Sequence, residues 1–364
     1  MEKIMALEPD YFAGFQCDGR RCGACCCRRR WGILVDEGTY QKYLALQDED
    51  REWVLKNIVQ EPPGNSSKGV QGQGMTQRHN LNLTEGCPFL RDDRLCALQR
   101  KFGEDYICDT CALYPRKIMQ IGSRFERSLS LSCPLVAELA LLRQEPVRFV
   151  TNALPTGRES GWQQTATGEG EEGMAEAFWL LQQTGIAILQ NQGKTVQERL
   201  RTLLAFLRES DEAVEKGEMG ELMALAARYQ EDRGEMVSLP ADRSIWLQEL
   251  KRVLVKVETA NEHKQAVEPM ATERELPPWP LFWENFLVSE YFFGIYPCRL
   301  GGSLQHNGEV FLALSDLLEE AVREPYQAGD AAGVLAACVR LATLADHDKD
   351  WLAALSLFVD KVDK

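Results

Sequence analysis

The spacing of apolar residues predicts a series of amphipathic helices over the C-terminal part of the chain. One group of leucines follows the i, i+3, i+4, i+7 spacing of a helix face: Leu200, Leu203, Leu204 and Leu207. Thr195 and Glu198 form the pattern of a capping box, so this helix is expected to begin directly after Thr195. Similar stripes run over 219–230, 243–257, 281–293, 309–323, 331–345 and 350–362.

Polar segments divide the chain into two regions. Residues 60–74 are rich in Gly, Pro, Ser and Gln, a composition typical of a surface loop. Residues 151–173 are polar and rich in glycine, and we interpret 146–175 as a linker. Beyond the linker no period-2 run is long enough for a sheet. The pattern therefore predicts a mainly α protein, with an irregular cysteine-rich, metal-binding N-terminal region over 1–145 and an α-helical domain over 176–364.

Composition and charge exclude several classes of protein. The 364 residues are 45% hydrophobic and 26% charged, which is ordinary for a globular protein. No window of 18 uninterrupted apolar residues predicts a membrane span. A net charge of −14 argues against a nucleic-acid partner. The first residues carry acids and no apolar core of a signal peptide, so we expect a cytoplasmic protein.

The cysteines are the strongest chemical signal. A cysteine-dense sequence in a reducing compartment favours metal or redox chemistry over disulfides. Ten of the 12 cysteines precede residue 134. They form four groups: Cys17, Cys22, Cys25, Cys26 and Cys27; Cys87 and Cys96; Cys108 and Cys111; and Cys133. Thiolates suit Zn²⁺ or an iron–sulfur cluster, and the spacing does not decide between the two.

Five arginines flank the first cysteine group: Arg20, Arg21, Arg28, Arg29 and Arg30. Their guanidinium groups would offset the negative charge of a cluster held by thiolates. They could equally bind an anionic ligand or an acidic peptide, or form a solvated basic face.

Three stretches carry a family resemblance. They are FQCDGRRCGACCCRRRWGILVD over 15–36, CPFLRDDRLCALQRKFGEDYICDTCALYPR over 87–116 and SLSLSCPLVAELALL over 128–142. In order and spacing they resemble the flagellin lysine-N-methylase family, the FliB type, and they are similar to the broader CxxCxxCC iron- or zinc-chelating superfamily. The C-terminal region matches more loosely, through 283–297 and the helices around His347.

The resemblance implies an enzyme that transfers the methyl group of S-adenosylmethionine to lysine side chains of flagellin, and a [4Fe–4S] cluster held by cysteines. By position, the family's cysteines fall on Cys17, Cys22, Cys26, Cys27, Cys87, Cys96, Cys111 and Cys133. The superfamily's CGxCC form would instead use Cys22, Cys25 and Cys26, so Cys25 is also a candidate ligand, whereas Cys108 is treated as a spectator. Eight cysteines exceed the four ligands of one cluster, so some are structural or a second metal binds.

The familiar cofactor motifs do not locate an S-adenosylmethionine site. Gly168, Gly170 and Gly173 match G-x-G-x-x-G, but no strand precedes them and the intervening glutamates would repel an anion. The radical-enzyme spacing C-x3-C-x2-C is absent, because Arg29 stands where its last cysteine would be. One hypothesis is that an open iron position chelates the amino and carboxylate groups of the cofactor.

Methyl transfer to lysine also requires an acid–base group. A lysine with a pKa of about 10.4 is protonated at neutral pH and is not a nucleophile until it loses its proton. Tyr114, three residues after Cys111, is the best-placed candidate base, with a tyrosine on a core turn as the other reading. Arg116 could bind a carboxylate, such as that of the cofactor, or serve in an ordinary ion pair.

The remaining polar candidates favour structural readings. His79 and His306 are expected at the surface, His347 at a helix end and Asp36 as a helix cap. The aromatic residues between 279 and 296 have helical spacing and are expected in the core.

A different class of function also fits the cysteines. The protein could be a non-enzymatic thiolate metal-binding protein, with Fe–S or Zn, that acts as a redox or metal sensor or as an interaction module. Binding of S-adenosylmethionine would separate the methyltransferase from this alternative.

Overall fold

The computed structural model describes residues 4–29, 32–61, 78–83, 86–154, 164–165, 172–232, 234, 236–237, 243–260 and 269–362. Helices dominate and some strands are present, which confirms the mainly α prediction. The described chain divides into two compact units. Residues 17–114 form unit 2, and the other described residues form unit 1.

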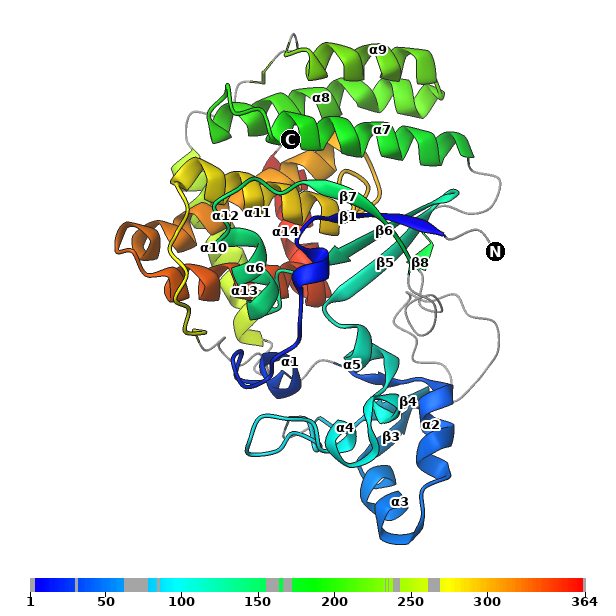
Figure 1. Ribbon diagram of the computed structural model, residues 1–364. Helices are drawn as coiled ribbons and strands as arrows, with labels where there is room; N and C mark the ends of the chain where they lie inside the picture. Colours follow the sequence, from blue (N-terminus) through cyan, green and yellow to red (C-terminus); the bar gives the residue numbers. More distant parts are fainter. Residues whose placement is uncertain are drawn as a thin grey trace. The chain divides into compact units, whose positions relative to one another are not determined.

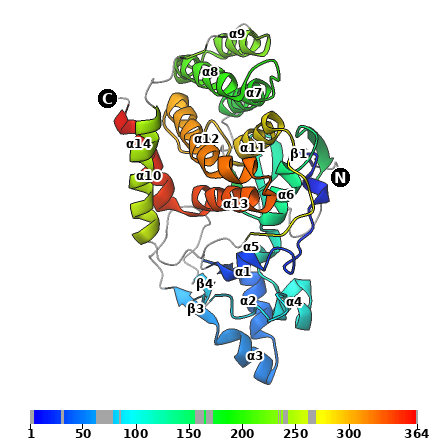
Figure 2. The same ribbon diagram turned by 90° about the vertical axis from the view of Figure 1, so that its left-hand side faces the viewer.

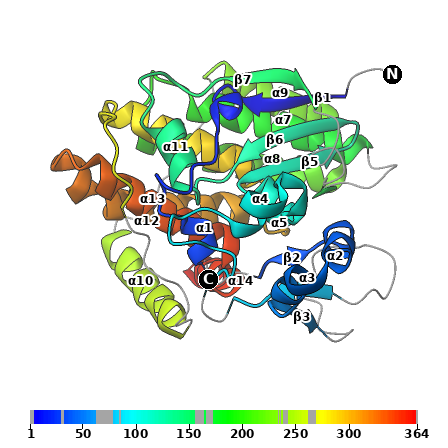
Figure 3. The same cartoon turned by 60° about the horizontal axis from the view of Figure 1, so that its bottom comes forward.

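A mixed five-stranded sheet lies in unit 1 (Figure 3). Its strands are β1 (Met5–Pro9), β5 (Arg116–Ile121), β6 (Arg124–Leu129), β7 (Phe149–Ala153) and β8 (Gln164–Thr165), in the order β7-β1-β6-β5-β8. β5 and β6 form an antiparallel hairpin, whereas β1 pairs parallel to β6 and antiparallel to β7. The N-terminal strand β1 is therefore an interior strand, between β7 and the central strand β6.

Helices make up the rest of unit 1. They are α6 (Pro134–Leu141), α7 (Glu172–Leu189), α8 (Val196–Lys216), α9 (Met219–Gln230), α10 (Arg243–Ala260), α11 (Trp279–Phe293), α12 (Leu304–Gln327), α13 (Ala331–His347) and α14 (Lys349–Val362), with a short 3-10 turn at Phe12–Gly14. α7, α8 and α9 lie side by side (Figure 1), and α10 packs along α14 (Figure 2). Every predicted C-terminal stripe is confirmed as a helix.

The sequence signals at the helix ends operate as expected. Thr195 accepts a hydrogen bond from the backbone N–H of Glu198, and Glu198 accepts one from the N–H of Thr195. Leu200, Leu203 and Leu207 are buried, because they face the neighbouring helices. α11 is apolar around most of its circumference and is buried accordingly, which confirms the predicted aromatic core at Trp283 and its neighbours.

The packing of α7 on α11 depends on the absence of a side chain at Gly185. A Cβ at Gly185 would collide with the ring of Tyr291, which is fully buried and has no room to move. We expect Gly185→Ala to lower the free energy of unfolding by about 1–3 kcal/mol, because overpacking forces buried groups apart. Urea denaturation followed by circular dichroism measures this. An unchanged or stabilised variant would contradict the close packing.

Unit 2 is small and combines short helices with a three-stranded antiparallel sheet. Its elements are α1 (Cys25–Arg28), β2 (Leu34–Val35), α2 (Glu37–Leu44), α3 (Asp48–Leu55), β3 (Ile58–Glu61), β4 (Arg78–Leu81), α4 (Ala97–Phe102), a 3-10 turn (Glu104–Tyr106) and α5 (Asp109–Leu113), with the sheet order β2-β4-β3. Tyr43, Val54, Phe89 and Leu98 form its buried core.

Two expectations about the first half of the chain need correction. The region 1–145 is not irregular throughout: β1, β5 and β6 belong to the sheet of unit 1, and unit 2 has its own sheet. The segment 146–175 is not all linker, because β7 pairs with β1 and α7 begins at Glu172. Gln60 and Glu61 of the predicted loop extend β3, and most of that loop lies outside the described residues. Gly168 and Gly170 also lie outside them.

No helix within the described ranges combines the length and the apolar character that crossing a membrane requires.

Candidate metal centre

The first cysteine group lies on a tight loop that ends in α1. Gly23 and Ala24 both have positive φ angles, 66° and 55°, which turn the chain sharply before Cys25. The N–H of Ala24 donates to the carbonyl of Gly19 at 2.7 Å. A Cβ at Gly19 would lie 2.6 Å from the carbonyl oxygen of Arg94, so glycine allows this loop to contact the turn that precedes Cys96.

A backbone hydrogen bond joins the first cysteine group to the second. The N–H of Cys87 donates to the carbonyl of Cys27 at 3.0 Å, and the Sγ atoms of Cys26 and Cys27 are 3.9 Å apart. Interactions with the thiols of Cys26 and Cys87 raise the pKa of Cys27, whereas the interaction with Cys27 lowers the pKa of Cys87 to about 7. Cys26 and Cys87 therefore both lie within interaction distance of Cys27.

The third group is held in place by Asp36. This carboxylate caps α2 by accepting from the N–H of Thr39 at 2.8 Å, which confirms the predicted cap. Its other oxygen accepts from the N–H of Asp109 at 2.9 Å and so positions the start of α5. Cys108 precedes α5, and Cys111 lies within it. The interaction between their thiols lowers the pKa of Cys108 and raises that of Cys111.

The thiols of the first two cysteine groups also affect the pKa values of Cys111 and Cys96. The interaction with Cys108 and burial raise the pKa of Cys111, and the charges of Cys87 and Cys26 raise it further. Burial, with smaller contributions from Cys87 and Cys108, raises the pKa of Cys96. We call the six residues of this set the thiol cluster: Cys26, Cys27, Cys87, Cys96, Cys108 and Cys111. Among the described residues, no three His, Cys, Asp or Glu side chains are close enough together to hold a metal ion as they stand.

The remaining candidate ligands are Cys17, Cys22, Cys25 and Cys133, and the thiols of Cys22 and Cys25 also interact with Cys26. Cys22 and Cys25 are half-buried, and burial raises the pKa of both thiols, that of Cys25 to about 11. Cys17 is exposed. Cys133 is buried at the start of α6 and belongs to unit 1.

The predicted acid–base residues fall on either side of the boundary between the units. Tyr114 is half-buried directly after α5 in unit 2. Arg116 begins β5 in unit 1, where its guanidinium lies over the ring of Phe15, 5.0 Å from the centroid. Their catalytic roles stay predictions.

The three histidines considered above, of the four in the chain, have structural contacts. His79 is not at the surface: it is buried on the central strand β4 and stacks on Tyr40, with ring centroids 3.5 Å apart. His306 is not a plain surface residue either: it is half-buried in the first turn of α12, which Ser303 caps, and it lies near Ser356 and Asp360. His347 ends α13, as predicted, and its Nε2 is 3.0 Å from the Oγ of Ser132.

Cys108, interpreted as a spectator, is buried beside Cys111, and its role stays a prediction. Sequence reasoning missed a buried ionic group in unit 1, where Arg299 contacts Glu290 at 3.2 Å and Asp346 at 3.0 Å. No local pattern marks these residues, because their partners lie on different helices.

This chain is similar to known proteins of Salmonella. It is 31% identical over 142 residues to a lysine-N-methylase of Salmonella typhimurium and 31% identical over 141 residues to that of Salmonella choleraesuis. Each match covers 39% of this chain and 33% of the relative. The flagellar biosynthetic protein FliU of Salmonella muenchen is 32% identical over 142 residues, 39% of this chain and 79% of FliU. The chain belongs to the flagellin lysine-N-methylase family.

This membership rests on part of the chain. The similarity spans about a third of the length of the two lysine-N-methylases. No family model and no solved structure matches the chain. The flagellin lysine-N-methylase resemblance inferred from the motifs is thus confirmed, whereas membership of the broader chelating superfamily stays a prediction.

Proposed function

We propose that this chain is a protein-lysine methyltransferase that uses S-adenosylmethionine to methylate lysine side chains of flagellin. The observation that carries the proposal is the similarity to two proteins named lysine-N-methylase, together with the match to most of FliU. A flagellar partner is consistent with the name of FliU. The net charge of −14 would help to attract a lysine-bearing protein surface by steering the encounter.

The proposal includes a thiolate-held metal group, with a [4Fe–4S] cluster as the first candidate and zinc as the second. The donor chemistry of the thiol cluster fits such a group, because soft thiolates from three separate sequence segments lie near one another. Metal binding would require side chains to turn from their present positions, since no three donors converge among the described residues. Cys27, which is a ligand in the family register but not in the CGxCC register, contacts Cys87, and this supports the family register.

The reaction itself sets two demands on this chain. The substrate lysine must lose its proton before it can attack the methyl carbon, since its ordinary pKa is about 10.4. Nitrogen, methyl carbon and sulfur must also be aligned, and such positioning can supply several kcal/mol of the barrier. In this proposal the phenolate form of Tyr114 accepts the proton of the lysine ammonium and becomes a neutral phenol, and Arg116 remains available for a carboxylate.

Metal analysis tests the cysteine part of the proposal. We expect the anaerobically purified protein to be brown, with a broad absorption band and about four irons per chain. Cys87→Ser should lose both iron and methyl transfer to flagellin. Cys298→Ser is the matched control, because Cys298 is an exposed cysteine of unit 1, and it should keep both.

Two results would contradict the proposal in different ways. A colourless protein with about one or two zinc ions would reduce the thiol cluster to a structural site. Iron-loaded protein that leaves flagellin unmodified in the presence of labelled S-adenosylmethionine would favour the sensor or interaction-module alternative.

A further inference from the structure

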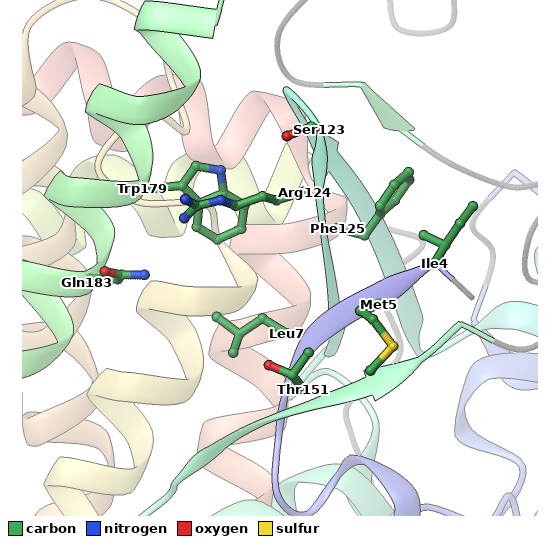
Figure 4. Close-up of a pocket in the computed structure, with 9 residues that line it drawn as sticks. All are labelled: Ile4, Met5, Leu7, Ser123, Arg124, Phe125, Thr151, Trp179 and Gln183. Atoms are coloured by element: carbon green, nitrogen blue, oxygen red, sulfur yellow. The ribbon is translucent and has the colours of Figure 1, made fainter. Parts of the chain in front are cut away.

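A surface cavity of about 560 Å³ opens between the sheet of unit 1 and α7 (Figure 4). Met5 and Leu7 of β1 and Thr151 of β7 line one side, and Trp179 and Gln183 of α7 line the other. Arg124 of β6 lies on the same side of the cavity as Trp179. The volume is within the range of about 300–1,000 Å³ typical of small-molecule sites. All of the lining residues belong to unit 1, and none is a cysteine.

The structure fixes the indole of Trp179 in position. Its Nε1 donates to the carbonyl oxygen of Ile121 at 3.3 Å in a buried hydrogen bond. The next residue, Gly122, has a φ of 58°, and a Cβ there would lie 2.7 Å from the Cβ of Ala175. Glycine therefore lets the β5–β6 turn rest on the first turns of α7. The ring is thus held before any ligand arrives, which lowers the cost of binding.

Arg124 completes a flat, positively charged surface. Its guanidinium lies over the Trp179 ring, 5.4 Å from the centroid, and Figure 4 shows the two side chains overlapping. Arg124 is the single charged residue among the described residues that line the cavity. A guanidinium can bind a carboxylate through two hydrogen bonds and offers a plane for stacking. The hydroxyls of Ser123 and Thr151 and the amide of Gln183 add polar contacts to otherwise apolar walls.

A buried carboxyl lies next to the inner wall. Glu126 is the register partner of Leu7 on the adjacent strand, and it lies two residues from Arg124 along the same face of β6. Neighbouring strands are about 4.8 Å apart and register partners share a face of the sheet, so Glu126 lies beside Leu7, although it is not one of the lining residues. Gln182, next to Gln183 on α7, donates to one Glu126 oxygen at 3.4 Å, and the other oxygen has no hydrogen-bond partner among the described residues.

We propose that this cavity binds the methyl donor S-adenosylmethionine, with its carboxylate on Arg124 and its adenine against the Arg124–Trp179 surface. The assignment rests on the proposed function, which requires such a donor. The ligand combines a planar heteroaromatic ring, a carboxylate and a cationic centre. The cavity offers a stacking surface for the ring and a guanidinium for the carboxylate within one space.

Calorimetric titration of the anaerobically purified protein with S-adenosylmethionine, and with its demethylated product S-adenosylhomocysteine, tests the assignment. Arg124→Gln should raise the Kd about tenfold or more, because a charge-assisted hydrogen bond contributes about 1.5–3 kcal/mol. Arg124→Lys should have an intermediate effect, since it keeps the charge without the fork of donors. Arg323→Gln is the control, because Arg323 is an exposed arginine on α12. Cys87→Ser should bind like the wild type.

The other outcomes separate the cavity from the proposed function. If the wild type binds and Arg124→Gln binds equally well, the cavity assignment is wrong and the methyl donor has another site. A loss confined to Arg116→Gln would move the site to Arg116, and a loss confined to Cys87→Ser would favour chelation by iron. If the wild type binds neither compound, dependence on S-adenosylmethionine and the cavity assignment both fail.

Discussion

Arg299→Met is expected to destabilise this protein by about 3–5 kcal/mol, because removing one partner leaves uncompensated charges in the interior. The guanidinium of Arg299 contacts Glu290 at 3.2 Å and Asp346 at 3.0 Å, and the two acidic side chains are only 1% and 2% exposed. It also donates to the carbonyl of Ala345 at 2.7 Å. Without it, two acidic side chains and a carbonyl lose their common partner.

The same group of residues connects the sheet to the C-terminal helices. The Oγ of Ser130 donates to the second oxygen of Asp346 at 2.6 Å and lies 2.6 Å from the Oγ of Ser132, which in turn contacts His347. The segment after β6 and the end of α13 therefore depend on one another. Loss of Arg299 should loosen both.

Chemical denaturation of Arg299→Met, compared with Arg323→Met, measures the effect. The exposed Arg323 should change the free energy of unfolding by less than about 0.5 kcal/mol. Arg299→Met/Asp346→Asn should recover part of the loss, because the double variant also removes the carboxylate of Asp346. If Arg299→Met lowers the free energy of unfolding no more than Arg323→Met does, the ionic group contributes little to stability.

The helices of unit 1 were predictable because their signals are local. The leucines at 200–207 repeat within one helix, and the capping box at Thr195 and Glu198 spans three peptide bonds. A similar local signal, Asp36 before α2, was also read correctly. In each case the residues that determine the structure are neighbours in the sequence, so their spacing alone carries the information.

The sheet of unit 1 has no such signal. Ala6 pairs with Phe125 and with Asn152, partners that only the folded chain brings together. β1 is short, and side chains on both of its faces are partly or fully buried, so it lacks the alternation of a half-exposed strand.

The candidate sites also differ in whether their residues are neighbours in the sequence. The cysteine motifs identified the segments that contribute to the thiol cluster, since metal-binding loops are compact in sequence. The cavity at Arg124 and Trp179 was not foreseen, because its lining comes from β1, β6, β7 and α7. The pKa values of Lys117, Glu126 and Glu290 likewise depend on burial, which a single sequence does not report.

Glu126→Gln is expected to remove a large pH dependence of stability. Burial raises the pKa of Glu126 to about 8, and a hydrogen bond from Gln182 and the charge of Lys117 offset this only in part. The folded protein therefore holds a proton on Glu126 between pH 4.5 and about 8, whereas the unfolded chain has released it. Because the folded state binds more protons in this window, stability falls as the pH rises, by as much as about 5 kcal/mol in total.

Comparing the two proteins isolates this contribution. The neutral amide of Glu126→Gln has no proton to lose, so the variant should gain stability relative to the wild type from pH 5 to pH 8. Glu290, whose pKa burial also raises to about 8, is present in both proteins, so its contribution cancels in the difference. Burial lowers the pKa of Lys117 to about 8, so its titration affects stability mainly above this window. Urea denaturation at pH 5, 6, 7 and 8 gives the two profiles. Parallel profiles would mean that Glu126 has an ordinary pKa, and that the carboxyl beside the cavity is ionised and hydrated at neutral pH.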